Sequence, residues 1–500
     1  MRLEQLVVDS AERHPDRPAV KDEATELTYE ELDTLAGRAA SALRELGVGA
    51  GDRVAIWLNK SVQAVAAMQG TLRVGAAYVP VDPMSPSIRA GTIMRDCQVR
   101  ALVAPSDRAR SVADEGLAGV AVISADDGPA DMTWTDLEQL DATLPARFRR
   151  EDDLAYILYT SGSTGVPKGV CISHRNALAF VEWAAREVQA RPDDRFSNHA
   201  PFHFDLSVFD LYAAFLSGAR VAIVPEQHAY SPGALVDFVV DEAISVWYAV
   251  PSALILMVDR GGLLDRPDLP LRAVVFAGEP YPIKALRRLR QGMPAVRLFN
   301  WYGPTETNVC TGYEVKDIPP DREVPVPIGR AVSGDRVWAV KEDGSEAGIG
   351  DEGELLVAGP TVALGYWGRT PQGDEPYRTG DLVRRQPDGD YLYIGRRDHM
   401  VKIRGHRVEL GEVEAAILTH PEITDAAVVT AGAGIDAKLV AFIAGRRELA
   451  LLEVKRLCAE RLPRHMIVDR AIFVEELPRT RNGKVDRLAL ARMTVEGVAI

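Results

Sequence analysis

The chain has 500 residues, 47% of them hydrophobic and 26% charged, and its formal net charge is −14 at pH 7. A chain of this length exceeds one ordinary core, so we expect at least two domains. The negative charge argues against a nucleic-acid surface and against an anionic membrane as partner. No stretch approaches the ~20 uninterrupted apolar residues of a membrane-spanning helix.

Cysteine usage and the start of the chain indicate the cellular compartment. The first ten residues are charged and amphipathic, unlike a secretory signal. The cysteines stand far apart without C-x-x-C spacing, at Cys97, Cys171, Cys310 and Cys458. This spacing suits a reducing compartment and argues against structural disulfides or a zinc site. We therefore expect a cytoplasmic protein of enzyme size.

Hydrophobic periodicity predicts an α/β fold for most of the chain. The first fifty residues read as two helices around a turn, 3–13 and 28–46, and Thr28 with Glu31 forms a capping-box pattern. Strand-like runs then alternate with helix-like segments: strands 54–58, 76–81 and 100–103, and helices 61–74 and 86–97. The alternation resumes at helix 175–190 and continues to strand 296–300. This spacing predicts largely parallel sheets.

The remainder of the chain has a different rhythm. Short β segments with Gly/Asp turns predict a small β subdomain at 328–368. An α+β module follows, with strands 401–403, 426–430 and 439–443 and helices 410–419 and 449–462. We place a domain boundary near Asp398, which gives a large N-terminal core domain at 1–397 and a small C-terminal domain at 398–500.

The stretch 159–169 has the composition of a phosphate-binding loop. It follows the apolar run 154–158 and precedes a helix-like segment that opens near His174. Its glycines permit a tight turn that points backbone N–H groups at an anion, and its other polar side chains suit phosphate oxygens. The P-loop pattern does not fit, because Lys168 precedes its glycine. Composition alone leaves a flexible Gly/Ser linker as the alternative.

Three further motifs carry polar groups that fit a nucleotide. The run 300–308 ends a predicted strand, where ligands bind in open α/β sheets. There Tyr302 offers a flat face for a base, and Glu306 offers a hard oxygen for Mg²⁺; an ordinary turn with a solvated glutamate is the alternative. Asp381 follows a turn glycine and suits ribose hydroxyls or an Asx turn. By composition alone, Lys484 is a surface charge.

Together these motifs have the order of a known family: 159–169, 300–306, 353–357, 377–381, 395–409 and 482–486. The series resembles the adenylate-forming superfamily, in particular the amino-acid adenylation domains of nonribosomal peptide synthesis and their free-standing aminoacyl:carrier-protein ligase relatives. The resemblance covers nearly the whole chain, and it implies ATP and Mg²⁺ as cofactors.

The resemblance also implies roles for single residues. The first motif would cradle the β- and γ-phosphates of ATP through Thr160, Ser161, Gly162, Ser163, Thr164, Gly165 and Lys168. The nucleoside would be bound by Gly278, Glu279, Pro280, Asn300, Trp301, Tyr302, Gly303, Asp381, Tyr393 and Arg396. The catalytic residues would be Thr305 at the α-phosphate, Glu306 on Mg²⁺, and Lys484. Asp398 would be the hinge of a mobile C-terminal domain that swings Lys484 in to bridge the substrate carboxylate and the α-phosphate.

Asp205 is the residue most informative about substrate. In adenylation domains an aspartate at this place pairs with the α-ammonium of an amino acid, and an activator of fatty or aryl acids has no use for an unpaired buried carboxylate. Asp205 directly precedes a predicted helix at 206–217, so a helix N-cap is the alternative.

Motif alignment gives an apolar side-chain pocket: Leu206, Phe209, Tyr248, Val275, Ala277, Trp301, Val309 and Cys310. None of these offers a charge. Because Trp301 is large and is expected to fill the far end, we favour a small neutral amino acid, alanine first and then serine or glycine. Much of the pattern also resembles free-standing prolyl-adenylating ligases, so proline is the main rival. Helix-period packing explains several of these residues equally well as plain core.

We therefore predict a two-step ligase that forms an aminoacyl-AMP and then transfers the amino acid to a thiol. No carrier domain follows Lys484, so we expect the thiol on the phosphopantetheine arm of a separate carrier protein in a natural-product pathway such as antibiotic biosynthesis, with coenzyme A as a less favoured acceptor. The alternatives are an L-prolyl- or D-alanine:carrier-protein ligase, although the latter enzymes carry a cysteine where Ala277 stands. An acyl- or aryl-CoA ligase and an inactive carrier-binding module also remain open.

Overall fold

The computed structural model describes residues 1–113, 116–117, 119–142, 150–162, 166–397, 400–403, 405–432, 436–479 and 485–495. The chain forms two compact units. The first comprises Met1–Pro83, Met94–Leu158 and Gly169–Arg397, and the second comprises Met84–Ile93, Tyr159–Lys168 and Asp398–Ile500. Two short segments of the predicted N-terminal domain thus belong to the second unit.

A large mixed sheet holds the strands that lead to most predicted site residues. Its strands are, in order across the sheet, β16 (Arg330–Ala331), β15 (Thr311–Val315), β14 (Arg297–Tyr302), β13 (Ala273–Ala277), β12 (Val246–Ala249), β10 (Arg195–Asn198), β11 (Arg220–Ile223), β1 (Pro18–Lys21) and β2 (Glu26–Thr28). The strands from β14 to β1 pair in parallel, and the edge strands pair antiparallel. The α/β fold class is confirmed. The hairpin of β1 and β2 was not predicted, because these short runs have little apolar periodicity.

A second large sheet contains the strands that flank the glycine-rich loop. It runs β19 (Gly365–Tyr366), β9 (Lys168–Ser173), β8 (Leu154–Thr160), β4 (Ala77–Pro80), β3 (Arg53–Ile56), β5 (Ala101–Ala104), β6 (Ala121–Ser124) and β7 (Met132–Thr133). The helix expected near His174 is confirmed as α6 (His174–Glu187), but strand β9, which lies between the loop and that helix, was not predicted. The loop therefore joins two neighbouring strands, unlike the strand–loop–helix arrangement of a P-loop.

The predicted β subdomain is an antiparallel sheet that extends beyond the expected limit. Its strands are β17 (Arg336–Val340), β18 (Glu352–Ala358), β20 (Tyr377–Arg385) and β21 (Tyr391–Arg396). Since β20 carries Asp381 and β21 carries Tyr393 and Arg396, this sheet places the predicted ribose-binding residues.

Helices occupy the connections between the strands of the large sheets. They are α1 (Gln5–Arg13), α2 (Tyr29–Glu45), α3 (Val62–Val74), α4 (Ser87–Asp96), α5 (Ser106–Ala113), α6 (His174–Glu187), α9 (Pro232–Asp241), α10 (Pro251–Asp259) and α11 (Ile283–Gly292). The capping box of α2 is confirmed, because Thr28 Oγ1 accepts from the Glu31 N–H and the Glu31 carboxylate accepts from the Thr28 N–H.

The helix after Asp205 is irregular. It begins as α7 (Leu206–Val208), continues as a π-helical turn at Phe209–Ala213, and ends as α8 (Ala214–Ser217) before Gly218, whose φ is 70°. Single π-turns inside helices occur frequently at functional sites. The turn carries Phe209, one of the predicted pocket residues.

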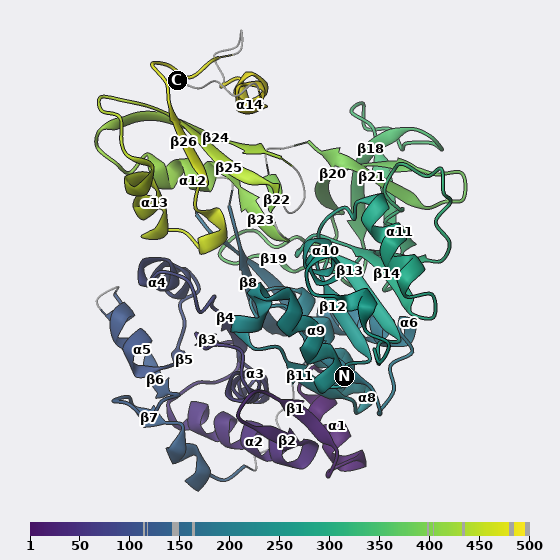
Figure 1. The fold of residues 1–500 in the computed structure, drawn as a ribbon. Coiled ribbons are helices and arrows are strands. Elements are labelled where there is room, and N and C mark those ends of the chain that lie inside the picture. The colour runs from purple at the N-terminus through teal and green to yellow at the C-terminus, as the bar shows by residue number, and fades with distance from the viewer. Residues whose placement is uncertain are drawn as a thin grey trace. The chain divides into compact units, whose positions relative to one another are not determined.

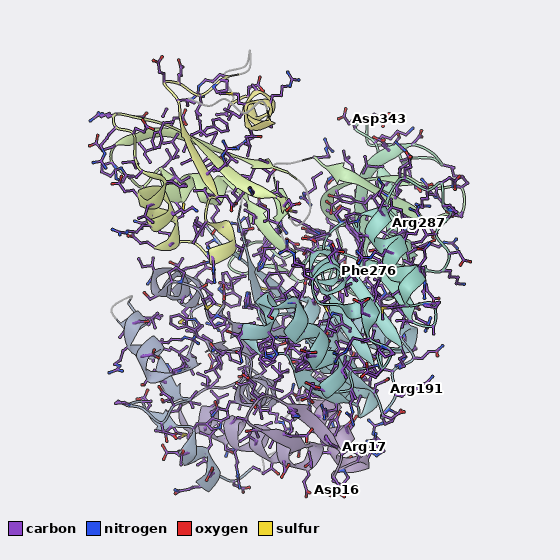
Figure 2. The ribbon with its side chains drawn as sticks, viewed as in Figure 1. Asp16, Arg17, Arg191, Phe276, Arg287 and Asp343 are labelled. Atoms are coloured by element: carbon purple, nitrogen blue, oxygen red, sulfur yellow. The ribbon has the colours of Figure 1, made fainter. Side chains whose placement is uncertain are left out.

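Two apolar clusters fix the large sheets of the first unit. One joins both sheets through α2, α3, α6 and the 206–217 helix, and it contains Phe180, Phe209 and Trp301. The other lies under α9, α10 and α11, which cover strands β12 to β14 in Figure 1, and it contains Phe276. Figure 2 shows Phe276 among the inner side chains, whereas Asp16 and Asp343 lie at the surface.

The second unit is the predicted α+β module. Its strands are β22 (Met400–Ile403), β23 (His406–Glu409), β24 (Ile423–Ala431), β25 (Lys438–Gly445) and β26 (Arg470–Phe473), and its helices are α12 (Leu410–Ile417), α13 (Leu451–Ala459) and α14 (Arg487–Val495). Strands β23 and β26 and helix α14 were not predicted. Across both units, none of the described helices is long and apolar enough to cross a membrane.

Candidate active site

One face of the first sheet gathers the predicted side-chain pocket. Tyr248 pairs with Val275 across β12 and β13, and Ala277 pairs with Trp301 across β13 and β14. Because side chains alternate along a strand, these four lie on the same face near the carboxyl ends of parallel strands. They share one apolar cluster with Phe209 and Val309, and Leu206 packs against it.

Trp301 is the centre of this face. Its side chain is 1% exposed, and its ring centroid lies 5.1 Å from that of Phe209 and 5.6 Å from that of Tyr248, with edge-to-face geometry. Helix α6 adds two aromatic rings that the sequence analysis missed, Phe180 at 6.1 Å and Trp183 at 4.9 Å. No sequence signal assigns α6 to the site, since its apolar spacing is that of an ordinary core helix.

Cys310 does not join this face. It belongs to a different apolar cluster, with Tyr302 and residues of the β subdomain, and its Sγ lies 3.6 Å from the Tyr302 carbonyl oxygen. Burial raises the pKa of the Cys310 thiol to about 12. The structure therefore associates Cys310 with the predicted nucleoside side of the site.

Asp205 directly precedes α7 and interacts electrostatically with the phenols of Tyr248 and Tyr156. Asp205 stands at the N-cap position of α7, but its side chain makes no capping hydrogen bond to that helix. Burial raises the pKa of Tyr248 and of Tyr156, and the charge of Asp205 contributes to both shifts. The half-buried Asp205 carboxylate thus acts electrostatically on two buried phenols, and a bound cation there would be attracted more strongly than in bulk water.

A buried polar network that the sequence analysis missed flanks the Asp205 loop. Lys60 Nζ donates to the carbonyl oxygens of Asn198 and His199, at 2.8 and 3.0 Å. Asn198 Nδ2 donates to Asp210 Oδ2 at 3.1 Å, and Asp210 stands in the π-helical turn after Asp205. Burial raises the pKa of Asp210 and lowers the pKa of Lys60 to about 7. The network ties the chain before the loop to the helix after it.

The predicted nucleoside residues of β14, β20 and β21 form one hydrogen-bonded group. The Tyr302 phenol donates to Asp381 Oδ2, and Arg396 Nη1 donates to Asp381 Oδ1 at 2.9 Å. The Tyr393 ring lies 6.4 Å from that of Tyr302. Burial, followed by the neighbouring charge of Asp381, raises the pKa of Tyr302, so the phenol remains a donor. The structure brings these four predicted residues together.

The turns around Tyr302 require close backbone approach. A Cβ at Gly303 would lie 1.6 Å from the Asn308 carbonyl oxygen, so only glycine fits there. Gly278 adopts a φ of 92° directly after β13. The Asn300 amide donates to Pro327 O at 2.8 Å, and Glu279 accepts from the Ser252 N–H at 3.2 Å. Both side chains are thus held at the carboxyl ends of the strands.

Glu306 is the predicted Mg²⁺ ligand. Its side chain is 2% exposed, and Oε1 accepts a hydrogen bond from Tyr366 at 2.7 Å. Among the described residues no group of three or more His, Cys, Asp or Glu side chains is arranged to hold a metal. One carboxylate fits Mg²⁺, because this ion commonly takes one or two carboxylates and completes its shell with substrate phosphates and water. Thr305 directly precedes Glu306 and is half-buried.

Only part of the predicted phosphate loop can be placed. Within the second unit, Ser161 Oγ donates to Arg407 O at 3.0 Å and the Gly162 N–H donates to Glu412 Oε2 at 3.3 Å. Thr160 ends β8 and Lys168 begins β9. Outside the described residues lie Ser163, Thr164, Gly165, the predicted hinge Asp398 and the predicted catalytic Lys484.

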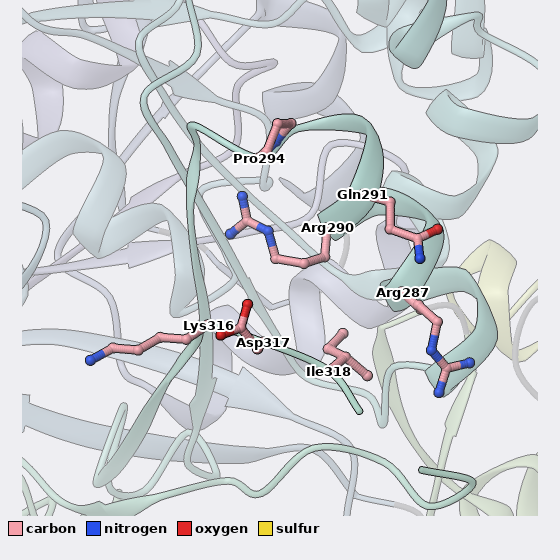
Figure 3. A pocket seen from close by; sticks show the side chains of 7 residues that line it. All are labelled: Arg287, Arg290, Gln291, Pro294, Lys316, Asp317 and Ile318. Carbon is pink, nitrogen blue, oxygen red and sulfur yellow. The ribbon is translucent and has the colours of Figure 1, made fainter. Parts of the chain in front are cut away.

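A surface pocket elsewhere in the first unit contains none of the predicted site residues. It has a volume of about 420 Å³ and is lined by α11 and the segment after β15. Its arginines already donate to main-chain carbonyls, Arg290 to Val315 and Arg287 to Pro319 and Arg322. In Figure 3 the cationic ends of these arginines and of Lys316 point in different directions. They do not converge on one ligand.

Comparison with protein families decides the identity of the fold. Residues 7–367 match the model of the AMP-binding enzyme family, and residues 412–484 match the model of the AMP-binding enzyme C-terminal domain. The chain belongs to the AMP-binding enzyme family. The family resemblance expected from the motifs is confirmed, and this AMP-binding enzyme is an ATP-dependent adenylate-forming ligase.

Relatives of this AMP-binding enzyme share its whole length. It is 50% identical to an L-proline--[L-prolyl-carrier protein] ligase of Pseudomonas fluorescens, over 99% of each chain. It is 39% identical to a protein of the same name from Streptomyces coelicolor, over 96% of this chain and 94% of the relative. The fold matches that of the Vibrio cholerae adenylation domain AlmE, solved with glycyl-adenosine-5'-phosphate, with a TM-score of 0.85, 24% identity and coverage of 99% and 98%.

Proposed function

We propose that this enzyme activates L-proline with ATP and transfers the prolyl group to the phosphopantetheine thiol of a separate carrier protein. The observation that carries the proposal is the 50% identity, over 99% of both chains, to a ligase named for L-proline and the L-prolyl-carrier protein. A second relative with the same name, 39% identical over nearly the full length, supports it.

The ranking of alanine before proline is not supported by these relatives. The ranking depended on Trp301 filling the far end of the pocket. In the structure the indole packs against α6 through Phe180 and Trp183 as well as against Phe209 and Tyr248. Residue size alone does not tell how far a side chain reaches into a pocket, because neighbouring packing sets its direction.

The chemistry of the face suits proline. Proline brings an apolar ring and a charged secondary ammonium. The proline ring would contact the apolar surfaces of Tyr248, Ala277 and Trp301. This contact would remove the apolar area of the ring from water. The ammonium would pair with the Asp205 carboxylate, which is half-buried, so that the attraction would be stronger than in bulk water. No cationic side chain on the pocket face is needed to hold the substrate carboxylate, since that role falls to Lys484.

The reaction follows from these placements. A carboxylate oxygen of proline attacks the α-phosphorus of ATP, forming prolyl-AMP as the bond to pyrophosphate breaks. The sulfur of the carrier thiol then attacks the acyl carbon, the thiol proton is lost, the acyl–phosphate bond breaks, and AMP leaves. Asp381 with Arg396 would hold the ribose, Tyr302 would stack on adenine, and Lys484 would stabilise the charge that develops at the α-phosphate. Bound Mg²⁺ would neutralise phosphate charge beside Glu306.

Amino-acid-dependent exchange of pyrophosphate into ATP tests the first step. A panel of L- and D-amino acids, fatty acids and aryl acids should give the highest kcat/KM with L-proline. Exchange with D-alanine alone would instead indicate a D-alanine ligase, exchange with acyl or aryl acids alone a CoA-type ligase, and no exchange with any acid an inactive module. Each of these outcomes would overturn the proposal.

Asp205 provides the sharper test of substrate class. Asp205→Asn should lower kcat/KM for proline by about 100-fold, since a charge-assisted hydrogen bond is worth about 1.5–3 kcal/mol and the variant also removes the ion pair. The KM for ATP should not change. Asp193→Asn, at an exposed aspartate of the same unit, is the matched control. An unchanged KM for proline in Asp205→Asn would exclude the ammonium role.

Transfer to a carrier tests the second step. Phosphopantetheinylated carrier proteins, each incubated with the enzyme, ATP and labelled proline, should acquire label as a thioester, and free coenzyme A should not. Placement in a natural-product pathway and in the cytoplasm stay predictions from the sequence.

A further inference from the structure

Trp301 is fixed by packing alone. Among the residues that the structure describes, its Nε1 has no hydrogen-bond partner although the atom is buried. An indole without a polar anchor takes the orientation that its ring contacts impose. The nearest ring is that of Trp183 on α6, with centroids 4.9 Å apart and planes inclined by 53°.

Gly312 makes room for this contact. It lies directly opposite Trp301 in the β14–β15 ladder, so a side chain at this position would stand beside the indole. A Cβ built at Gly312 would lie 3.1 and 3.2 Å from two ring carbons of Trp183 and 3.4 Å from Cδ1 of Trp301. The Trp183 indole therefore sits over Gly312, in the space that a side chain of β15 would otherwise occupy.

The order of the strands shows which neighbours lie on each side of Trp301. Next to the edge strand β16, the strands run β15, β14, β13 and β12, so Trp301 has Gly312 and the Trp183 ring on one side and Ala277 on the other. Because the Trp183 ring contacts the Trp301 indole from the β15 side, the Trp301 indole cannot tilt away from Ala277. Ala277 and Tyr248 belong to the face that we propose to receive the proline ring.

We propose that Trp183 is a positioning residue for substrate selection: seated over Gly312, it holds the Trp301 indole toward Ala277 and limits the size of the ring that the enzyme accepts. This inference rests on the proposed activation of proline. Trp183 itself does not touch the substrate in this arrangement. It acts through Trp301.

Cyclic amino acids of increasing ring size measure the effect directly. Azetidine-2-carboxylate, proline and pipecolate differ by one methylene each, and one methylene in an apolar pocket changes selectivity by about 10- to 200-fold. In Trp183→Leu the Trp301 indole can lean toward β15, so the ratio of kcat/KM for pipecolate to that for proline should rise about tenfold. The KM for ATP should stay the same.

A methyl group at Gly312 should act in the opposite direction. Gly312→Ala has no φ penalty to meet, since this glycine does not adopt the left-handed region, but its Cβ presses on both indoles. The pipecolate-to-proline ratio should fall, and the azetidine-2-carboxylate-to-proline ratio should rise. Trp183→Phe keeps an aromatic ring over Gly312, so its pipecolate-to-proline ratio should stay closer to that of wild type than the ratio of Trp183→Leu.

Trp338 supplies the matched control. It is also half-buried and lies on β17 of the antiparallel sheet, where its ring packs under the Arg336 guanidinium at 4.6 Å. Trp338→Leu removes a ring of the same size and should leave all three ratios unchanged. If Trp183→Leu fails to fold, Gly312→Ala decides the outcome, and a pipecolate-to-proline ratio equal to that of wild type would overturn the positioning role.

The possible failures are distinguishable. A wild-type enzyme without proline-dependent exchange would overturn the proposed function itself. A wild-type enzyme that activates proline, with ring-size ratios that are equal in Trp183→Leu, Gly312→Ala and wild type, would overturn the positioning role of Trp183 alone. A change in the Trp338→Leu control equal to that in Trp183→Leu would also overturn it, since the effect would then reflect general loss of packing.

Discussion

Tyr302 and Arg396 bind opposite oxygens of one carboxylate, that of Asp381: the phenol donates to Oδ2, and the guanidinium donates to Oδ1 at 2.9 Å. These side chains come from three strands, β14, β20 and β21. Asp381 is 2% exposed, and a buried carboxylate without such donors would be costly. The predicted ribose-binding group is thus orientated before a nucleotide arrives, which reduces the ordering that binding would require.

The Tyr302 hydroxyl should therefore matter separately from its ring. Tyr302→Phe keeps the surface for stacking on adenine and removes one donor to Asp381, a bond to a charged group worth about 1.5–3 kcal/mol. We expect the KM for ATP to rise about tenfold while the KM for the amino acid stays the same, as measured by pyrophosphate exchange. Tyr313→Phe, on β15, is the control. Equal KM values for ATP in Tyr302→Phe and wild type would show that the contact has no role in nucleotide binding.

Tyr366 should tune the Mg²⁺ requirement through Glu306. Its phenol donates to Glu306 Oε1 at 2.7 Å, and partners that orient a metal-binding carboxylate are typically worth about 10- to 100-fold in metal affinity. We expect Tyr366→Phe to raise the half-saturating Mg²⁺ concentration about tenfold, and Glu306→Gln to raise it further. Titration of Mg²⁺ at fixed ATP measures both.

The control for the metal titration is Glu323→Gln, at an exposed glutamate of the same unit. It should leave the Mg²⁺ dependence unchanged. A Glu306→Gln enzyme with the wild-type Mg²⁺ dependence would remove Glu306 from the metal site, whatever its effect on kcat.

Asp210 should make the stability of the enzyme depend on pH. Burial raises its pKa well above the ordinary value of 3.8, so the folded protein holds this proton more tightly than the unfolded chain. Stability from this group is therefore fully present below pH 3.8 and is lost as the pH rises toward the folded pKa. Asp210→Asn keeps an acceptor for the Asn198 amide and removes the titration.

The melting temperature of Asp210→Asn minus that of wild type should accordingly increase as the pH rises from 4.5 to 7.5. Thermal unfolding at several pH values, with Asp193→Asn as the exposed control, measures the difference. A gain that is the same at every pH, or that shrinks as the pH rises, would contradict the assignment of the buried proton to Asp210.

The sequence predicted the parts of the site that stand in contiguous motifs at strand ends. Runs such as 300–306 place Tyr302 and Glu306 within one turn of a recognisable strand, so their grouping follows from local pattern. The α/β alternation was also readable, because buried parallel strands are continuous apolar runs. Strands β1 and β9 were missed, since each pairs on one side with a strand far away in the chain, β11 for β1 and β19 for β9, which no local pattern indicates.

The sequence did not predict the residues that contribute to the site only through tertiary packing. Trp183 and Gly312 lie 129 positions apart, and their meeting depends on which helix covers which face of the sheet. Lys60 looks like a surface lysine in a loop, yet its Nζ donates to carbonyls at the end of β10. The ranking of alanine first, which the relatives do not support, has the same origin: the volume of Trp301 follows from the sequence, but the direction in which its side chain packs does not.

Lys484 carries the prediction with the largest expected effect. As a compact cation at the α-phosphate it would stabilise charge that develops only during adenylation, and removal of one such donor typically lowers kcat by about 100- to 1000-fold. Lys484→Ala should show this loss in pyrophosphate exchange while transfer from preformed prolyl-AMP to the carrier thiol continues, because the second step does not develop charge at that phosphate oxygen in the same way. Lys438→Ala, an exposed lysine on β25, should affect neither step. Undiminished exchange in Lys484→Ala would refute the proposed role of this lysine in adenylation.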